Sequence, residues 1–126
     1  MMQVPEDLKY TDEHEWIKQI DGRLRVGITD YAQDQLGDIV YVEIPEVGKS
    51  VAKEDILVEV ESTKSVGEVY SPVAGTIAAV NEAVADNPEL VNSSPYEEGW
   101  LVEIDPEGEL DDSALLDATA YRELTE

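Results

Sequence analysis

Short runs in which apolar and polar residues alternate, each followed by a turn signal, constrain the fold of this chain more than any other feature. A half-buried β-strand has this period of two, whereas an amphipathic helix repeats every 3.6 residues. Seven or eight short strands at such close spacing predict a mainly β protein, a sandwich or flattened barrel. The clearest runs cover residues 14–20, 23–28, 38–44, 56–61, 66–70, 76–80 and 99–104.

The segments between the runs contain residues that favour tight turns. Asp21-Gly22 predicts a two-residue hairpin, and Pro45–Gly48 and Pro72–Gly75 predict further turns. The polar segment Glu61–Ser65 separates two alternating runs and is too short for anything but a hairpin turn. Lys64 is therefore expected at the tip of a β-hairpin.

Helices are expected to be few and short. Thr29 or Asp30 can cap a helix over residues 31–36, which Gly37 is placed to end. One helical turn is expected at residues 82–85, within a segment whose Asn, Ser and Pro content otherwise indicates a loop.

At its two ends the chain is expected to depart from the β pattern. Residues 1–8 show no periodicity, which indicates an extended arm. Two short helices are expected within residues 111–126, one over 111–117 and one over 119–124, the second capped by Thr119.

Charge limits the partners that such a protein can bind. The chain carries 30 Asp and Glu residues against 8 Lys and Arg residues, a net charge of −22. Because so few basic residues cannot form a surface for phosphates, unassisted binding to nucleic acids and to anionic membranes is excluded. No apolar run reaches the ~20 residues of a membrane span and no signal peptide is recognisable, so a cytoplasmic location is expected.

The same composition still allows a folded core. Leu, Val and Ile make up 33 of the 126 residues, which is above the level typical of disordered acidic chains, and the length is that of one domain, 1–126. The acidic residues are spread from Glu6 to Glu126. This spread fits a cytoplasmic protein of a halophilic organism, because high salt screens the repulsion between carboxylates.

Few residues are available for catalysis or metal binding. The chain has no Cys, one His and no glycine-rich phosphate loop. His14 lies beside a predicted strand, where a structural or surface role is the expected one. Acidic pairs such as Asp12-Glu13 and Glu97-Glu98 do not have the spacing of a calcium loop. We therefore expect no catalytic residue and no metal site, which argues against an enzyme.

Lys64 is the one residue whose predicted position suggests a functional role. A lysine in a turn is usually only solvated. A carrier domain, however, needs a lysine at a hairpin tip, because a modifying enzyme must reach the amine and the attached arm must then reach other active sites.

The residues around Lys64 resemble a known attachment motif. Glu61-Ser62-Thr63-Lys64 resembles the lipoyl motif E-S-[VT]-K, and Val69–Gly75 resembles the V-x-S-P-[VI]-x-G segment that follows the lipoyl lysine. Further blocks are similar to one family, the H proteins of the glycine cleavage system, and the resemblance extends from about Leu8 to Leu124. These blocks are 14–16, 26–32, 36–38 and 91–101.

The resemblance implies a fold and a function. The family fold is a lipoyl/biotinyl-type sandwich of two antiparallel sheets with short flanking helices. Lipoate would be attached as an amide to Lys64, with Glu61, Ser62 and Thr63 as the rest of the attachment motif. The carrier would be a monomer that takes an aminomethyl group from a PLP-dependent glycine decarboxylase to a tetrahydrofolate-dependent aminomethyltransferase. It would pass electrons to dihydrolipoyl dehydrogenase, and a lipoate ligase or lipoyl transferase would install the arm.

The resemblance also implies a cleft in which the loaded arm is held. The positions that line it in the family correspond to Glu15, Gln35 and Glu68, and the Glu15 carboxylate would pair with the protonated amine of the arm. The family often has His where this chain has Gln35, and Asp where it has Glu68. Gln can form hydrogen bonds but cannot change charge, so a mechanism that needs an imidazole at that position is in doubt.

Other lysine-modified carriers differ from this chain at or around the lysine. The swinging domain of a 2-oxoacid dehydrogenase usually carries a D-K-A motif and is fused to a larger chain, and a biotin carrier has Met on both sides of its lysine. Here Thr63 and Ser65 flank Lys64. An H-like relay protein that donates lipoyl groups to 2-oxoacid dehydrogenases remains open from the sequence.

Overall fold

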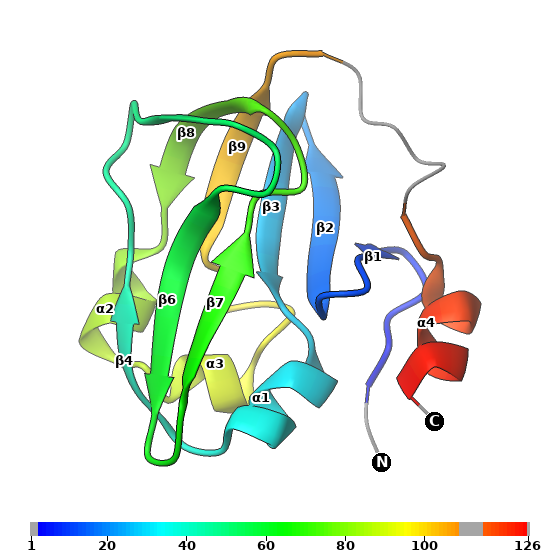
Figure 1. Cartoon of the computed structure of the whole chain (residues 1–126), viewed down its shortest axis with the longest axis vertical. Coiled ribbons are helices and arrows are strands. Elements are labelled where there is room, and N and C mark those ends of the chain that lie inside the picture. The colour runs from blue at the N-terminus through cyan, green and yellow to red at the C-terminus, as the bar shows by residue number, and fades with distance from the viewer. Residues whose placement is uncertain (1–2, 109–114, 126) are drawn as a thin grey trace.

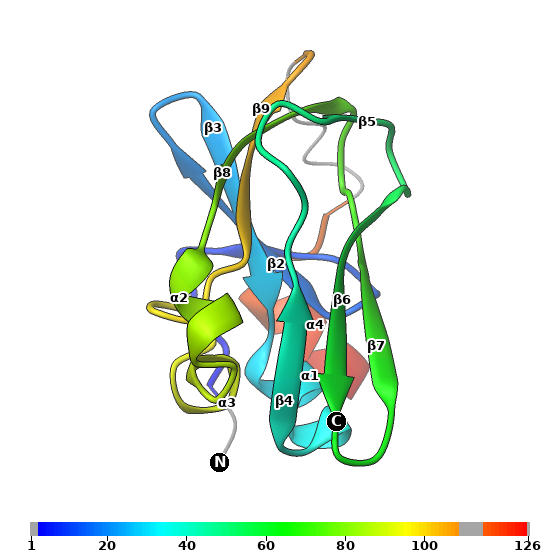
Figure 2. The ribbon, with the colours of Figure 1, turned by 90° about the vertical axis from the view of Figure 1, so that its left-hand side faces the viewer.

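The computed structural model describes residues 3–108 and 115–125, and it contains two antiparallel β-sheets (Figure 1). The smaller sheet has the order β4 (Ile39–Glu43), β6 (Ile56–Ser62) and β7 (Val66–Tyr70). The larger sheet has six strands, in the order β1 (Lys9–Tyr10), β2 (Glu15–Ile20), β3 (Arg23–Ile28), β9 (Val102–Pro106), β8 (Gly75–Val80) and β5 (Ser50–Val51). Figure 2 shows the two sheets as layers, with β4, β6 and β7 on the right. The predicted mainly β sandwich is confirmed.

Four short helices in the described residues surround the sheets: α1 (Asp30–Leu36), α2 (Glu82–Asp86), α3 (Leu90–Ser93) and α4 (Ala118–Thr125). Helix α1 follows the sequence prediction, because the Thr29 hydroxyl caps it by accepting from Ala32 N at 3.1 Å and Gly37 ends it with a φ of 85°. Among the described helices, none combines the length and the apolar character that crossing a membrane requires.

The main core lies between the two sheets. Val26 of β3, Val60 of β6 and Ile104 of β9 are fully buried in it. On β6 the predicted alternation holds from Val58, because Val58 and Val60 face the core while Glu61 is exposed. Before it, Ile56 is exposed and Leu57 is buried, because the register shifts between Ile56 and Val58. Burial of such side chains stabilises the fold by about 1.5–3 kcal/mol each.

A second, smaller core lies on the outer side of β1 and β2. It joins Tyr10, Trp16 and Tyr121 with Leu8 and Ala118, so that α4 packs against the start of the chain. The Trp16 ring lies directly on Gly27, where an added Cβ would sit 2.6 Å from the ring. A larger residue at this position would therefore displace the tryptophan.

The two ends of the chain differ from the prediction. The predicted helix over 111–117 falls partly on residues 109–114, which lie outside the described residues. Its last part is not helical, because Leu116 pairs with Tyr10 through two backbone hydrogen bonds of 2.8 Å. The second helix starts at Ala118, and Asp117 rather than Thr119 caps it by accepting from Ala120 N at 2.8 Å.

The start of the chain is also less extended than expected. Glu6 and Asp7 form a turn, and Leu8 is buried in the second core instead of continuing an arm. Helix α3 lies in a segment predicted as loop, and no side chain caps its start. The two-residue strands β1 and β5 are too short to produce a periodic pattern and were not predicted.

Candidate functional site

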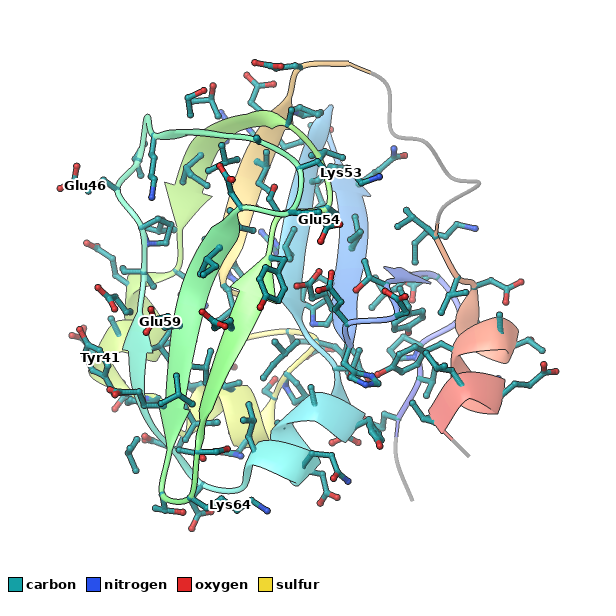
Figure 3. The ribbon with its side chains drawn as sticks, in the orientation of Figure 1. Tyr41, Glu46, Lys53, Glu54, Glu59 and Lys64 are labelled. Carbon is teal, nitrogen blue, oxygen red and sulfur yellow. The ribbon has the colours of Figure 1, made fainter. Side chains whose placement is uncertain are left out.

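The β6–β7 hairpin presents Lys64 at the lower end of the molecule, where the figure labels it (Figure 3). Glu61 pairs with Val66 across the two strands, and Ser62 N donates to Ser65 O at 2.8 Å to close the turn. Thr63, Lys64 and Ser65 are exposed. The predicted position of Lys64 at a hairpin tip is therefore confirmed.

The Ser62 hydroxyl determines the shape of the tip. It donates to Ser65 O at 2.9 Å and accepts from Ser65 N at 3.0 Å and Lys64 N at 3.3 Å. A hydroxyl has one donor and two acceptor sites, so its hydrogen-bonding capacity is fully used. Thr63 N also donates to Asp38 O at 3.0 Å, which ties the tip to the residue before β4.

The Lys64 amine is accessible. Within residues 3–108 and 115–125, the ion pairs join Arg23, Arg25 and Arg122 to glutamates and do not include Lys64. Its aliphatic stem passes close to Gly37, where an added Cβ would lie 3.4 Å from Lys64 Cε. The amine is thus free for modification while its stem lies beside the end of α1.

A cleft of about 310 Å³ lies between α1 and the hairpin. At the Lys64 end, Leu36 packs on Gly67, where an added Cβ would lie 3.1 Å from Leu36 Cδ2. The walls are mainly apolar, and the polar side chains come from Glu13, His14, Gln35 and Glu68. The full lining is Glu13, His14, Ile28, Tyr31, Ala32, Gln35, Leu36, Val60, Gly67, Glu68 and Val69.

Two of the three predicted cleft residues are in place, and the third is not. Gln35 and Glu68 line the cleft, whereas Glu15 does not. Only 1% of Glu15 is exposed, and its carboxyl group accepts from Tyr70 N at 2.5 Å and from the Thr11 hydroxyl at 3.2 Å. The expectation that the Glu15 carboxylate faces the cleft is therefore corrected: the side chain joins β2 to β7, and so joins the two sheets.

Burial dominates the protonation of Glu15. Removal from water raises its pKa to about 8, against the lowering effect of the Tyr70 N–H. At neutral pH the neutral acid predominates. A protonated carboxyl group would not attract the ammonium group of a loaded arm. The protonation state of Glu15 and its absence from the cleft lining therefore both argue against a role in binding that group.

Glu13 is the cleft residue that sequence reasoning missed. In a regular strand Glu13 and Glu15 would point the same way, but His14 between them has a φ of 67°, which breaks the alternation. Burial, and a hydrogen bond and repulsion from Glu54, raise the pKa of Glu13. Across the cleft, Glu68 accepts a hydrogen bond from the Tyr70 hydroxyl at 3.2 Å.

An exposed lysine on a hairpin tip of a two-sheet antiparallel sandwich, next to an apolar cleft, defines a swinging-arm carrier domain of the lipoyl/biotinyl class. Comparisons with known proteins identify the family within this class. The family model described as "Glycine cleavage H-protein" matches residues 8–126.

Curated relatives with the name "Glycine cleavage system H protein" include one from Listeria monocytogenes serotype 4a, 51% identical over 123 residues and 98% of both chains. Another is from Oceanobacillus iheyensis, 51% identical over 120 residues and 95% of both chains. The crystal structure of an H protein from Mycobacterium marinum matches with a TM-score of 0.86 and 41% identity, over 95% of this chain and 97% of that one. This chain belongs to the glycine cleavage H-protein family and is a carrier subunit of that system.

Proposed function

We propose that this chain carries lipoate as an amide on Lys64 and shuttles an aminomethyl group between the enzymes of glycine cleavage. The observation that carries the proposal is the exposed Lys64, held on a turn whose hydrogen bonds are all made. The chain itself does no catalysis. A lipoate ligase or lipoyl transferase recognises the tip formed by Glu61, Ser62 and Thr63, and the whole chain acts as one carrier domain in the cytoplasm.

The proposed partners are the enzymes that act on the lipoyl arm in turn. Glycine decarboxylase loads the aminomethyl group, aminomethyltransferase removes it, and dihydrolipoyl dehydrogenase reoxidises the dithiol that remains. Tethering keeps the intermediate on one carrier at a high effective concentration. The relatives described above are named as glycine cleavage system H proteins, which does not favour the H-like relay role.

The cleft suits such an arm in two ways. Its apolar wall, which includes Ile28, Leu36 and Val69, accommodates a hydrocarbon chain and a dithiolane ring. Gln35 and the carboxyl groups of Glu13 and Glu68 provide hydrogen bonds and charge for a protonated amine. With Gln35 where the family often has His, the docking at this position depends on hydrogen bonds alone.

Attachment at Lys64 is tested by mass spectrometry of protein produced with lipoate and an active ligase. Wild type is expected to gain one lipoyl group on Lys64. Lys64→Arg keeps the charge but cannot form the amide, so it should gain none. Lys53→Arg is the matched control, because Lys53 is also exposed in a turn but on a different loop (Figure 3). Lipoyl mass on any other lysine of the wild type would contradict the proposal.

A further inference from the structure

His14 is held in an unusual conformation at the wall of the cleft. Its φ of 67° lies in the left-handed region, which few side chains adopt. Backbone hydrogen bonds from His14 N to Thr11 O and from Thr29 N to His14 O secure it, at 3.2 and 3.1 Å. The imidazole packs on the Tyr31 ring with a centroid distance of 4.7 Å, and both rings line the cleft.

A chain of hydrogen bonds leads from this ring into the second core. His14 Nδ1 lies 2.8 Å from the Tyr121 hydroxyl, which lies 2.7 Å from Thr29 Oγ1. Thr29 Oγ1 in turn accepts from Ala32 N as the cap of α1. Tyr121 and Thr29 are fully buried, so water does not complete these bonds.

The direction of the bonds follows from counting donors. Thr29 has already accepted from Ala32 N, and its own proton needs an acceptor, which the Tyr121 oxygen supplies. The Tyr121 proton then goes to His14 Nδ1. The reverse order would leave the Thr29 proton buried without an acceptor. His14 therefore carries its proton on Nε2.

His14 Nε2 is open to solvent. It forms no hydrogen bond with a described residue, and in the described part of the chain no buried side-chain nitrogen or oxygen lacks a partner. Nε2 must therefore reach solvent, and His14 is one of the residues that line the cleft. Burial also lowers the pKa of His14, with Asp12 acting in the opposite direction, which favours the neutral ring.

We propose that Tyr121 of α4 is a positioning residue that fixes His14 as a neutral Nε2–H donor facing the cleft, so that a seated arm meets a hydrogen-bond donor without a positive charge. The inference rests on the proposed function and deepens it. A charged imidazole would repel the ammonium group of a loaded arm, whereas a neutral N–H can donate to a sulfur of the arm. The other titratable groups that face the ring are Asp12, Glu13, Tyr31 and Glu68.

The tautomer can be measured directly, because His14 is the only histidine of the chain and its signals need no assignment. Nitrogen-15 NMR of the protein without lipoate is expected to show a protonated Nε2 and an unprotonated Nδ1. Tyr121→Phe should reduce the ratio of the two tautomers about 10-fold. Tyr10→Phe is the matched control, since Tyr10 stacks on Tyr121 at 4.7 Å and its hydroxyl bonds to Pro5 O instead. A protonated Nδ1 in wild type, or an unchanged ratio in a folded Tyr121→Phe, would overturn the inference.

A second measurement tests the contact with the arm. Lipoylated protein is reduced and treated with formaldehyde and ammonia, which condense with one thiol to give an S-aminomethyl group and water. The His14 Nε2–H signal is expected to shift on loading in wild type and less so in Tyr121→Phe. Lipoyl mass on Lys64 without any shift would overturn the inference and leave the proposed function standing. No lipoyl mass would contradict the proposed function, and the tautomer, which needs no arm, would still decide the inference.

Discussion

At the scale of single residues, Glu15 shows how burial changes a role. Its carboxyl group bonds to Tyr70 N of the smaller sheet from a strand of the larger one, with 1% of the residue exposed. A carboxylate in such a place would be costly, and the protein avoids the cost by keeping the proton. Glu15 therefore contributes to the junction of the two sheets, and its stability contribution depends on pH.

The contribution of Glu15 to stability decreases as pH rises. The folded carboxyl group holds its proton up to a pKa of about 8, whereas an unperturbed one releases it near 4.5. Between these values the folded state binds more protons, so the free energy of unfolding falls as pH rises. Glu15→Gln removes the titration, and its amide oxygen can accept one of the two hydrogen bonds, from Tyr70 N or from the Thr11 hydroxyl. Relative to wild type, this variant should gain stability between pH 5 and pH 8, by at most about 1.4 kcal/mol per pH unit.

Urea unfolding of both proteins at constant salt measures this difference. Glu61→Gln serves as a control, because it is the same Glu-to-Gln change made at an exposed position on β6. We expect the stability gap between Glu61→Gln and wild type to vary less with pH. If the gap between Glu15→Gln and wild type did not change from pH 5 to pH 8, Glu15 would not be a buried neutral acid.

The same residue shows a limit of sequence reasoning. The family resemblance assigned Glu15, Gln35 and Glu68 to one cleft; Gln35 and Glu68 line the cleft beside α1, whereas Glu15 does not. The deciding feature is the positive φ of His14, which turns Glu13 toward the cleft and Glu15 away from it. A backbone angle in a four-residue turn leaves no periodic signal, so the exchange could not be foreseen.

At the scale of elements, the hairpins were the most predictable parts. Asp21-Gly22 has φ angles of 49° and 83°, as a two-residue turn with two left-handed positions requires. The Lys64 tip was predicted equally well, because a short polar segment between two alternating strands allows little else. The conformation of these turns is determined by residues next to one another in the sequence, so it can be predicted from the sequence alone.

Elements that depend on distant contacts were predicted poorly. Leu116 was assigned to a helix, yet it forms a bridge to Tyr10, more than a hundred residues away in sequence. Leu8 likewise leaves the expected arm because the second core buries it. In both cases tertiary packing outweighs the local conformational preference of the segment. Such long-range contacts cannot be predicted from a single sequence.

At the scale of the whole molecule, the acidic charge of the chain includes a row of like charges across the smaller sheet. Glu43 pairs with Glu59, and Glu59 pairs with Glu68, so three carboxylates from three strands stand in one row. Like charges directly opposite each other on a sheet are destabilising. This row adds a local repulsion to the net charge of −22.

The stability of the fold should therefore depend on salt. The midpoint of thermal unfolding is expected to rise from low-salt buffer to molar KCl, because the salt screens the repulsion. Glu59→Gln removes the central charge of the row and should raise the midpoint at low salt more than Glu46→Gln, a change on an exposed loop away from the row (Figure 3). The two variants should converge at high salt.

High salt also strengthens hydrophobic burial, so a neutral osmolyte must be run in parallel. A midpoint that rises equally with KCl and with the osmolyte would contradict a role for charge. A flat midpoint in KCl would refute the halophilic interpretation of the composition.

The central claim is that Lys64 alone makes this chain a carrier in glycine cleavage. It is tested most directly by a reconstituted reaction with glycine decarboxylase, aminomethyltransferase and dihydrolipoyl dehydrogenase, in which release of labelled CO₂ from carboxyl-labelled glycine is followed. Lipoylated wild type and Lys53→Arg are expected to support continuous release. Lys64→Arg, prepared in the same way, should release no more than a mixture without the chain. Sustained release with Lys64→Arg would contradict the account.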